Sequence, residues 1–215
     1  MPGHSHCLPL QRPKGLPVLV FPFVLVAILV ETSRAATSCS SREGIALNKT
    51  TKLARLMRKE SGELQKLYIS SQGDFYESFC QMPIDNIPDT TITGQTPSEK
   101  LQSIYTTLKV FYLHLAAVED QQIYLQEPSN PLLDKLRMVK AHTYNMAENM
   151  KPILQCLQPN EPISEPSWAP TQAPARNVFQ QKVYGCVVLT QYKEFLLQVV
   201  PELKAMISKV KNGHK

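Results

Sequence analysis

The chain has 215 residues, a formal net charge of +5 and 43% hydrophobic residues. Its charges are interspersed, with no long basic block, so the composition does not indicate a nucleic-acid-binding protein. The sequence contains no GxSxG, HExxH, phosphate-binding or dinucleotide-binding glycine motif. We therefore predict a protein that is not an enzyme and that needs neither a cofactor nor a metal ion.

The N-terminal segment is typical of a secretory signal peptide. Basic residues precede an uncharged, apolar run from Leu16 to Val30, which is shorter than the ~20 residues that a membrane-spanning helix needs. Small residues at Ser33 and Ala35 place the predicted cleavage after Ala35. We expect residues 1–35 to be the signal peptide and residues 36–215 to form one secreted domain without membrane insertion. An uncleaved anchor is the alternative.

Four cysteines and a single glycosylation sequon follow the predicted cleavage site. In an exported chain four cysteines most simply form two disulfides, and their wide spacing argues against a zinc site. These cysteines are Cys39, Cys80, Cys156 and Cys186. Asn48 begins the sequon Asn48-Lys49-Thr50 and is therefore the predicted glycosylation site.

The first predicted helix runs from Ser40 to about Ser71. Ser40 and Glu43 have the spacing of a capping box, and apolar residues then recur three or four apart along one face. That face comprises Leu53, Leu56, Met57, Leu64, Leu67 and Tyr68, and the opposite side carries Arg55, Arg58 and Lys66. The following segment, Gln72 to Gly94, has no sustained period and indicates an irregular loop.

Two further helices are predicted on either side of a short connection. Thr96-Pro97-Ser98-Glu99 combines a capping Thr, a Pro at the first helical position and a Glu at the third, and Pro128 ends the helix that begins there. Asn130 and Pro131 start a third helix, which Pro152 should kink or thin near its end. The predicted core faces are Leu101, Ile104, Tyr105, Leu108, Phe111, Tyr112, Leu115, Val118 and Ile123, and then Leu132, Leu136, Val139, Met146, Met150, Ile153 and Leu157.

The last predicted helix follows a proline-rich linker, Gln158 to Arg176. Asn177 is a favourable N-cap and Gln180 completes a start that resembles a capping box. The helical pattern continues to Lys211, although Pro201 should bend the helix. Its predicted core face comprises Val188, Tyr192, Phe195, Leu196, Val199, Leu203, Met206, Ile207 and Val210.

Phe179 does not belong to the core face of that last helix. At about 100° per residue it lies roughly 140° from the centre of the face, with Lys182 one turn further on. A large aromatic residue and a lysine outside the core face, at a helix start, predict a surface that binds a partner. The alternative is that Phe179 packs under the proline-rich linker, against Trp168.

The order of helices and loops predicts an all-α fold, a long-chain four-helix bundle. The short connection makes the second and third helices antiparallel neighbours. The two long loops permit the up-up-down-down topology with two crossover connections.

Several segments of the chain resemble the leukaemia inhibitory factor and ciliary neurotrophic factor branch of the interleukin-6-type cytokines. The segment Val178-Phe179-Gln180-Gln181-Lys182, followed by Gly185-Cys186, is similar to the start of the fourth helix in that branch, and closest to its leukaemia inhibitory factor side. The end of the first helix, Leu67 to Gly73 with Cys80 shortly after, and Ser98-Glu99-Lys100-Leu101 are also similar. The resemblance departs in cysteine content, since leukaemia inhibitory factor has six and only four follow the signal peptide here.

The resemblance implies a secreted, monomeric ligand that brings together class I cytokine receptor chains and triggers JAK/STAT signalling. In that branch an F-x-x-K motif engages the leukaemia inhibitory factor receptor, and the motif maps onto Phe179 and Lys182. The shared signal-transducing receptor would meet the exposed faces of the first and third helices, where Arg55, Arg58 and Lys66 are candidates. Two alternatives remain: a growth-hormone-branch hormone with a different receptor, and a lipid-binding bundle like an apolipoprotein.

The expected topology also predicts how the cysteines pair. Cys186 lies about 120° from the core face of the last helix, so it can reach Cys80 in a loop that crosses outside the bundle. Cys39 precedes the first helix and Cys156 ends the third, and these ends coincide in an up-up-down-down bundle. We therefore predict the pairs Cys80–Cys186 and Cys39–Cys156.

Overall fold

The computed structural model describes the backbone of residues 21–73, 77–166 and 177–212, and the side chains of 44–73, 77–166 and 177–209. The chain separates into two compact units, Met1–Ser38 and Cys39–Lys215. The first unit contains the beginning of helix α1, and the second contains the helical bundle. No helix in the described part of the chain is both long and apolar enough to cross a membrane.

Helix α1 spans Phe21–Ser70 and therefore begins well before the predicted start at Ser40. No Gly or Pro occurs between Phe23 and Glu43, so nothing in that stretch interrupts the helical hydrogen bonds. The side chains of Ser40 and Glu43, which were expected to cap the helix, lie outside the described residues, as does most of the predicted signal peptide's N-terminal half.

Helices α2 (Pro97–Leu125) and α3 (Pro131–Leu157) begin where their capping sequences predicted. Thr96 and Glu99 form a capping box at the start of α2, with Pro97 at the first helical position. The Oδ1 atom of Asn130 accepts a hydrogen bond from the backbone N–H of Leu132 at the start of α3. Both starts follow from local chemistry because each cap satisfies N–H groups that have no partner inside the helix.

The remaining elements are helix α4 (Val178–Asn212), which continues through Pro201, and a short 3₁₀ helix, η1 (Glu77–Gln81). The 3₁₀ helix lies in the segment predicted to be irregular, and that prediction was wrong for these five residues. A single 3₁₀ turn has too few residues to show a period in the sequence.

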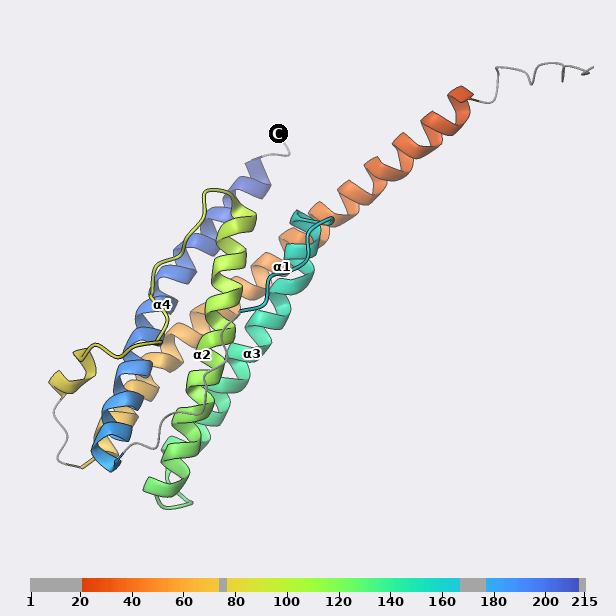
Figure 1. Cartoon of the computed structure of the whole chain (residues 1–215). Coiled ribbons are helices and arrows are strands. Elements are labelled where there is room, and N and C mark those ends of the chain that lie inside the picture. The colour runs from red at the N-terminus through yellow and green to blue at the C-terminus, as the bar shows by residue number, and fades with distance from the viewer. Residues whose placement is uncertain (1–20, 74–76, 167–176, 213–215) are drawn as a thin grey trace, which may run out of the picture. The chain divides into compact units, whose positions relative to one another are not determined.

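Residues 39–215 form an up-up-down-down arrangement in which α1 and α2 run in one direction and α3 and α4 in the other (Figure 1). Hydrogen bonds between helices give the same directions. Gln65 bonds to Thr190 while Tyr68, further along α1, bonds to the earlier α4 residue Lys182, so α1 and α4 are antiparallel. The described residues contain no β-strand. The prediction of an all-α four-helix bundle is confirmed.

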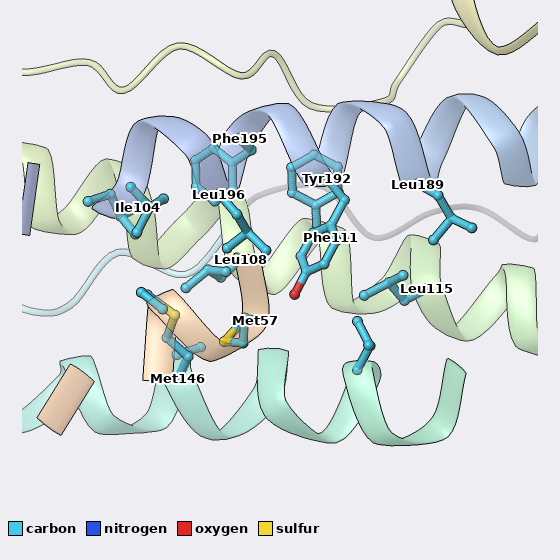
Figure 2. Close-up of a cluster of buried hydrophobic side chains, with 14 of the residues drawn as sticks. Met57, Ile104, Leu108, Phe111, Leu115, Met146, Leu189, Tyr192, Phe195 and Leu196 are labelled. Carbon is cyan, nitrogen blue, oxygen red and sulfur yellow. The ribbon is translucent and has the colours of Figure 1, made fainter. Parts of the chain in front are cut away.

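The core lies between the four helices and is built mainly from aromatic and branched side chains (Figure 2). The Phe111 ring lies 5.4 Å from that of Tyr192 and 5.5 Å from that of Phe195. The Tyr192 hydroxyl has a hydrogen-bond partner: Thr143 donates to the Val139 carbonyl, so the Tyr192 hydroxyl donates to Thr143 Oγ1 at 2.7 Å. Burial raises the pKa of Tyr192 above its ordinary value.

Two residues assigned to the core from the sequence are exposed instead: Leu56 (44% exposed) and Ile123 (45% exposed). On α1 the small or polar residues Thr50, Ala54 and Ser61 take core positions, which turns the buried face away from Leu56. On α2 the adjacent Gln122 is fully buried because it hydrogen-bonds within the bundle, so Ile123 points outward. Val210, also predicted to be in the core, lies outside the described side chains.

Candidate functional site

The start of α4 presents two apolar side chains to solvent. Asn177 Oδ1 accepts a hydrogen bond from the Gln180 N–H at 2.8 Å, and Gln180 Oε1 accepts one from the Asn177 N–H at 3.2 Å. This reciprocal cap fixes the first turn of the helix. Val178 is 53% exposed and Phe179 is 49% exposed. The aromatic residue singled out from the sequence is therefore a half-exposed side chain on a rigid helix start.

The inner half of the Phe179 side chain packs against η1. The Phe79 and Phe179 rings are 5.1 Å apart and nearly perpendicular, at 87°, which is a favoured geometry for aromatic pairs. The sequence predicted packing against Trp168 as an alternative, but that residue lies outside the described part of the chain. Phe79 is the partner that the structure does describe, and periodicity gave no signal for it.

A disulfide holds η1 against α4 directly beside this aromatic pair. Cys80 of η1 is bonded to Cys186 of α4, with their Cα atoms 4.9 Å apart, so the predicted pairing of these two residues is confirmed. Cys186 is fully buried, because η1 covers the side of α4 that faces away from the bundle core. Cys156 is disulfide-bonded too, and the side chain of its predicted partner Cys39 lies outside the described residues.

Lys182 contacts the end of α1. Its Nζ donates a hydrogen bond to the Gln72 carbonyl at 2.6 Å, just beyond Ser70, where α1 ends. A cation at a helix C-terminus interacts favourably with the helix dipole and with carbonyls that have no partner in the helix. The lysine of the F-x-x-K motif thus has a structural contact, in addition to its predicted role in binding a receptor.

A buried polar network connects α1, α2 and α4 beneath this surface. The Tyr68 hydroxyl donates to the Lys182 carbonyl at 3.1 Å and accepts from Gln122 Nε2 at 3.3 Å. Gln72 Nε2 donates to Gln122 Oε1 at 3.0 Å. Gly185 allows this arrangement, since a Cβ atom there would lie 2.2 Å from the Tyr68 hydroxyl oxygen. Burial raises the pKa of Tyr68, which keeps its phenol protonated as a donor.

The long loop before α2 is fixed to the bundle by His114. Its two ring nitrogens lie 2.7 Å from the Tyr184 hydroxyl and 2.9 Å from the Asn86 carbonyl, and His114 is buried. Because a carbonyl only accepts, the nitrogen facing Asn86 carries the proton. This histidine therefore has a structural role, which agrees with the absence of a metal-ligating cluster among the described residues.

The candidates for a second contact surface all lie on the exposed side of α1. Arg55, Arg58 and Lys66 are exposed. Earlier on α1, residues of α1 and α3 line an open groove of about 330 Å³: Ile45, Ala46, Lys49, Glu148, Asn149 and Pro152. Asn48 is exposed as well, and its Nδ2 donates to the Gly44 carbonyl at 2.8 Å. The predicted glycosylation site is thus accessible from solvent.

A four-helix bundle with up-up-down-down topology is the fold of the helical cytokines. Residues 46–203 match the family model described as "LIF / OSM family", and the chain belongs to this family. The predicted resemblance is confirmed, and the chain is an interleukin-6-type cytokine. Proteins of this family are signalling proteins and not enzymes, as the sequence also predicted.

Two curated relatives agree with this assignment. Ciliary neurotrophic factor of Sus scrofa is 21% identical over 160 residues, which cover 73% of this chain and 80% of the relative. Cardiotrophin-2 of Mus musculus is 24% identical over 203 residues, which cover 89% of this chain and 97% of the relative. The similarity therefore extends over most of the bundle and is not confined to one motif.

Proposed function

We propose that this cytokine is secreted after removal of residues 1–35 and acts as a monomer that brings two class I cytokine receptor chains together. Phe179 and Lys182 bind a receptor similar to the leukaemia inhibitory factor receptor. The exposed faces of α1 and α3 bind the shared signal-transducing receptor, and the resulting assembly triggers JAK/STAT signalling. The family match favours this function over the growth-hormone-branch and apolipoprotein-like alternatives.

The observation that carries the proposal is the half-exposed Phe179 on a doubly anchored support. Its ring rests on Phe79, and the adjacent disulfide between Cys80 and Cys186 prevents η1 from moving away. An aromatic side chain held in place before binding loses little conformational entropy when a partner covers it. Central aromatic residues of this kind contribute a large share of binding energy in protein interfaces.

The contact of Lys182 supports the proposal in a second way. By bonding to the Gln72 carbonyl, Lys182 joins the end of α1 to the start of α4 and so fixes the backbone on which Phe179 lies. Lys182 is only partly buried, so its ammonium group is also available to an acceptor on a receptor. The two residues of the motif therefore act differently: Phe179 supplies contact area, and Lys182 supplies charge and holds the surface together.

The test is to measure receptor affinity and thermal stability on the same preparations of Phe179→Ala. Truncating a central aromatic residue typically costs ~2–4 kcal/mol of binding, which corresponds to roughly 30- to 1,000-fold weaker affinity. Stability should fall by only ~2 kcal/mol: about 1 kcal/mol for the aromatic pair and about 1 kcal/mol for the buried half of the side chain. Lys182→Ala should weaken binding and also lower stability, because it removes the hydrogen bond to Gln72.

Leu197→Ala is the matched control, since Leu197 is a 40% exposed apolar residue on the same helix but far from its start. It should leave the affinity for the leukaemia inhibitory factor receptor ectodomain unchanged. Unaltered affinity in a folded Phe179→Ala variant would refute the proposed anchor. A large drop in melting temperature with unchanged affinity would instead assign Phe179 to packing.

A further inference from the structure

Unpaired positive charge is concentrated on the exposed side of α1. Every lysine and arginine of α2 and α3 forms an ion pair with a described carboxylate. Examples are Lys100 with Glu202 and Lys151 with Glu148. On α1, by contrast, five cations have no ion-pair or hydrogen-bond partner in the described part of the chain: Lys49, Lys52, Arg55, Arg58 and Lys66. A sixth, Lys59, lies 3.7 Å from Glu63 and is 78% exposed.

Both acidic residues of α1 between Gly44 and Ser70 are occupied elsewhere. Glu60 is buried and lies 2.8 Å from His142 of α3. Glu63 lies 2.7 Å from Lys135 of α3, whose side chain is mostly buried. Because these carboxylates serve the α1–α3 contact, they do little to neutralise the charge on the outward side of the helix.

The helical repeat places these cations in a stripe. At about 100° per residue, Lys52, Arg55, Lys59 and Lys66 fall within roughly 60° of one another, opposite the buried face. From Lys52 to Lys66 the stripe is about 21 Å long at the helical rise. All four side chains are exposed. We refer to them as the basic stripe.

We propose that the basic stripe binds a linear sulfated polysaccharide at the cell surface or in the extracellular matrix, a function additional to receptor assembly, with Arg55 and Lys66 common to both surfaces. Lysines predominate in the stripe and it contains no aromatic residue, whereas protein interfaces are depleted in lysine and enriched in aromatics. Insertion into a lipid surface would need a broad apolar face, and the exposed large apolar residues of α1 from Gly44 onward, Ile45 and Leu56, lie to one side. The ammonium groups of the basic stripe form a row of hydrated positive charges, which complements the repeated negative charges of a sulfated polysaccharide.

The probe for this inference is immobilised heparin, measured over a series of salt concentrations with the full secreted chain. The test variant is Lys52→Gln with Lys59→Gln, which keeps Arg55, Arg58 and Lys66, the residues named individually as candidates for receptor contact. The matched control is Lys204→Gln with Lys209→Gln, because both lysines are exposed on α4 and lie outside the stripe. The two variants have the same net charge, so a difference between them reports position.

Counterion release gives a slope of about 0.7–0.9 in log affinity against log salt for each neutralised charge on nucleic acids. On that scale each charge is worth roughly fivefold at 0.15 M salt, so the stripe variant should bind heparin about 20-fold more weakly. Its salt slope should fall by about 1.5, and the control should change less than threefold. Equal melting temperatures would show that both variants are folded.

Three results would overturn the inference. The first is no heparin binding by the unaltered chain at 0.15 M salt, and the second is an equal loss in the stripe and control variants, which indicates net charge alone. The third is binding to phosphatidylserine vesicles or to the shared receptor ectodomain that depends on Lys52 and Lys59 while heparin binding does not. These arms also separate this inference from the proposed function, since Phe179→Ala should leave heparin affinity unchanged.

Discussion

Substituting Gly185 by alanine is the most direct test of how the start of α4 is held against α1. A Cβ atom at this position would lie 2.2 Å from the Tyr68 hydroxyl oxygen and 2.6 Å from its Cζ. These distances are far below van der Waals contact, and Tyr68 is fully buried, so its ring must shift. The shift breaks the hydrogen bonds that join Tyr68 to the Lys182 carbonyl and to Gln122.

The change in the free energy of unfolding is the sum of two destabilising terms and one stabilising term. Overpacking a dense core costs ~1–3 kcal/mol, and leaving the buried Tyr68 hydroxyl without its partners costs a further ~1–3 kcal/mol. Alanine is favoured over glycine inside a helix by ~1 kcal/mol. The free energy of unfolding should therefore fall by about 3 kcal/mol. For a domain of this size that corresponds to a melting temperature lower by about 6–12 °C.

Gly62→Ala is the matched control, because Gly62 also lies inside a helix but a Cβ atom there meets nothing within 4 Å. That substitution should raise the melting temperature by about 2–4 °C. Thermal unfolding followed by circular dichroism measures both variants. In a Tyr68→Phe background Gly185→Ala should cost less, since the nearest atom is gone. A Gly185→Ala protein as stable as the unaltered chain would refute the close contact.

Two further predictions concern the disulfide and the buried phenols. Replacing both Cys80 and Cys186 by serine opens a loop with a sequence separation of 106, so guanidinium unfolding should show a loss of ~4–5 kcal/mol in the chain-entropy model; undiminished stability would contradict that contribution. Burial raises the pKa of Tyr68 and of Tyr192, so the folded state keeps these protons above the ordinary tyrosine pKa of ~10. Their contribution to stability is complete below that pH and is lost as the pH rises further. Phenolate absorbance should show both residues ionising only as the helical circular dichroism signal disappears, and ionisation in a protein that is still fully helical would count against their burial.

The elements that the sequence located best are those defined by neighbouring residues. The caps of Thr96, Asn130 and Asn177 each satisfy backbone N–H groups within one helical turn, so their effect does not depend on the rest of the fold. The long apolar faces of α2, α3 and α4 could also be predicted from the sequence, because a 3.6-residue period persists over many turns. The start of α1 was not, because the capping pattern at Ser40 occurs inside a longer helix-compatible stretch.

The candidate site likewise has features that the sequence predicts and features that it does not. The angular position of Phe179, outside the core face, was readable from the helical period, and the structure places it half-exposed. The residues that contact Phe179 and Lys182 could not be predicted from the sequence. Phe79 and Gln72 lie about a hundred residues before Phe179 and Lys182 in the chain, and no local pattern links such distant segments.

By itself, then, the sequence determined the number and order of the bundle helices after the first start, because caps and periods act over short distances along the chain. It also determined the relation to the LIF/OSM family, and the topology expected from the helix order was enough to pair Cys80 with Cys186. Only the tertiary structure decided that η1 supports Phe179, that Lys182 bonds to the end of α1 and that α3 engages Glu60 and Glu63, the carboxylates nearest to the basic stripe. These features depend on which distant groups meet in space, and on which carboxylates are already engaged between helices. Such pairings are settled by packing and by the satisfaction of buried polar groups, which no single segment of the chain contains.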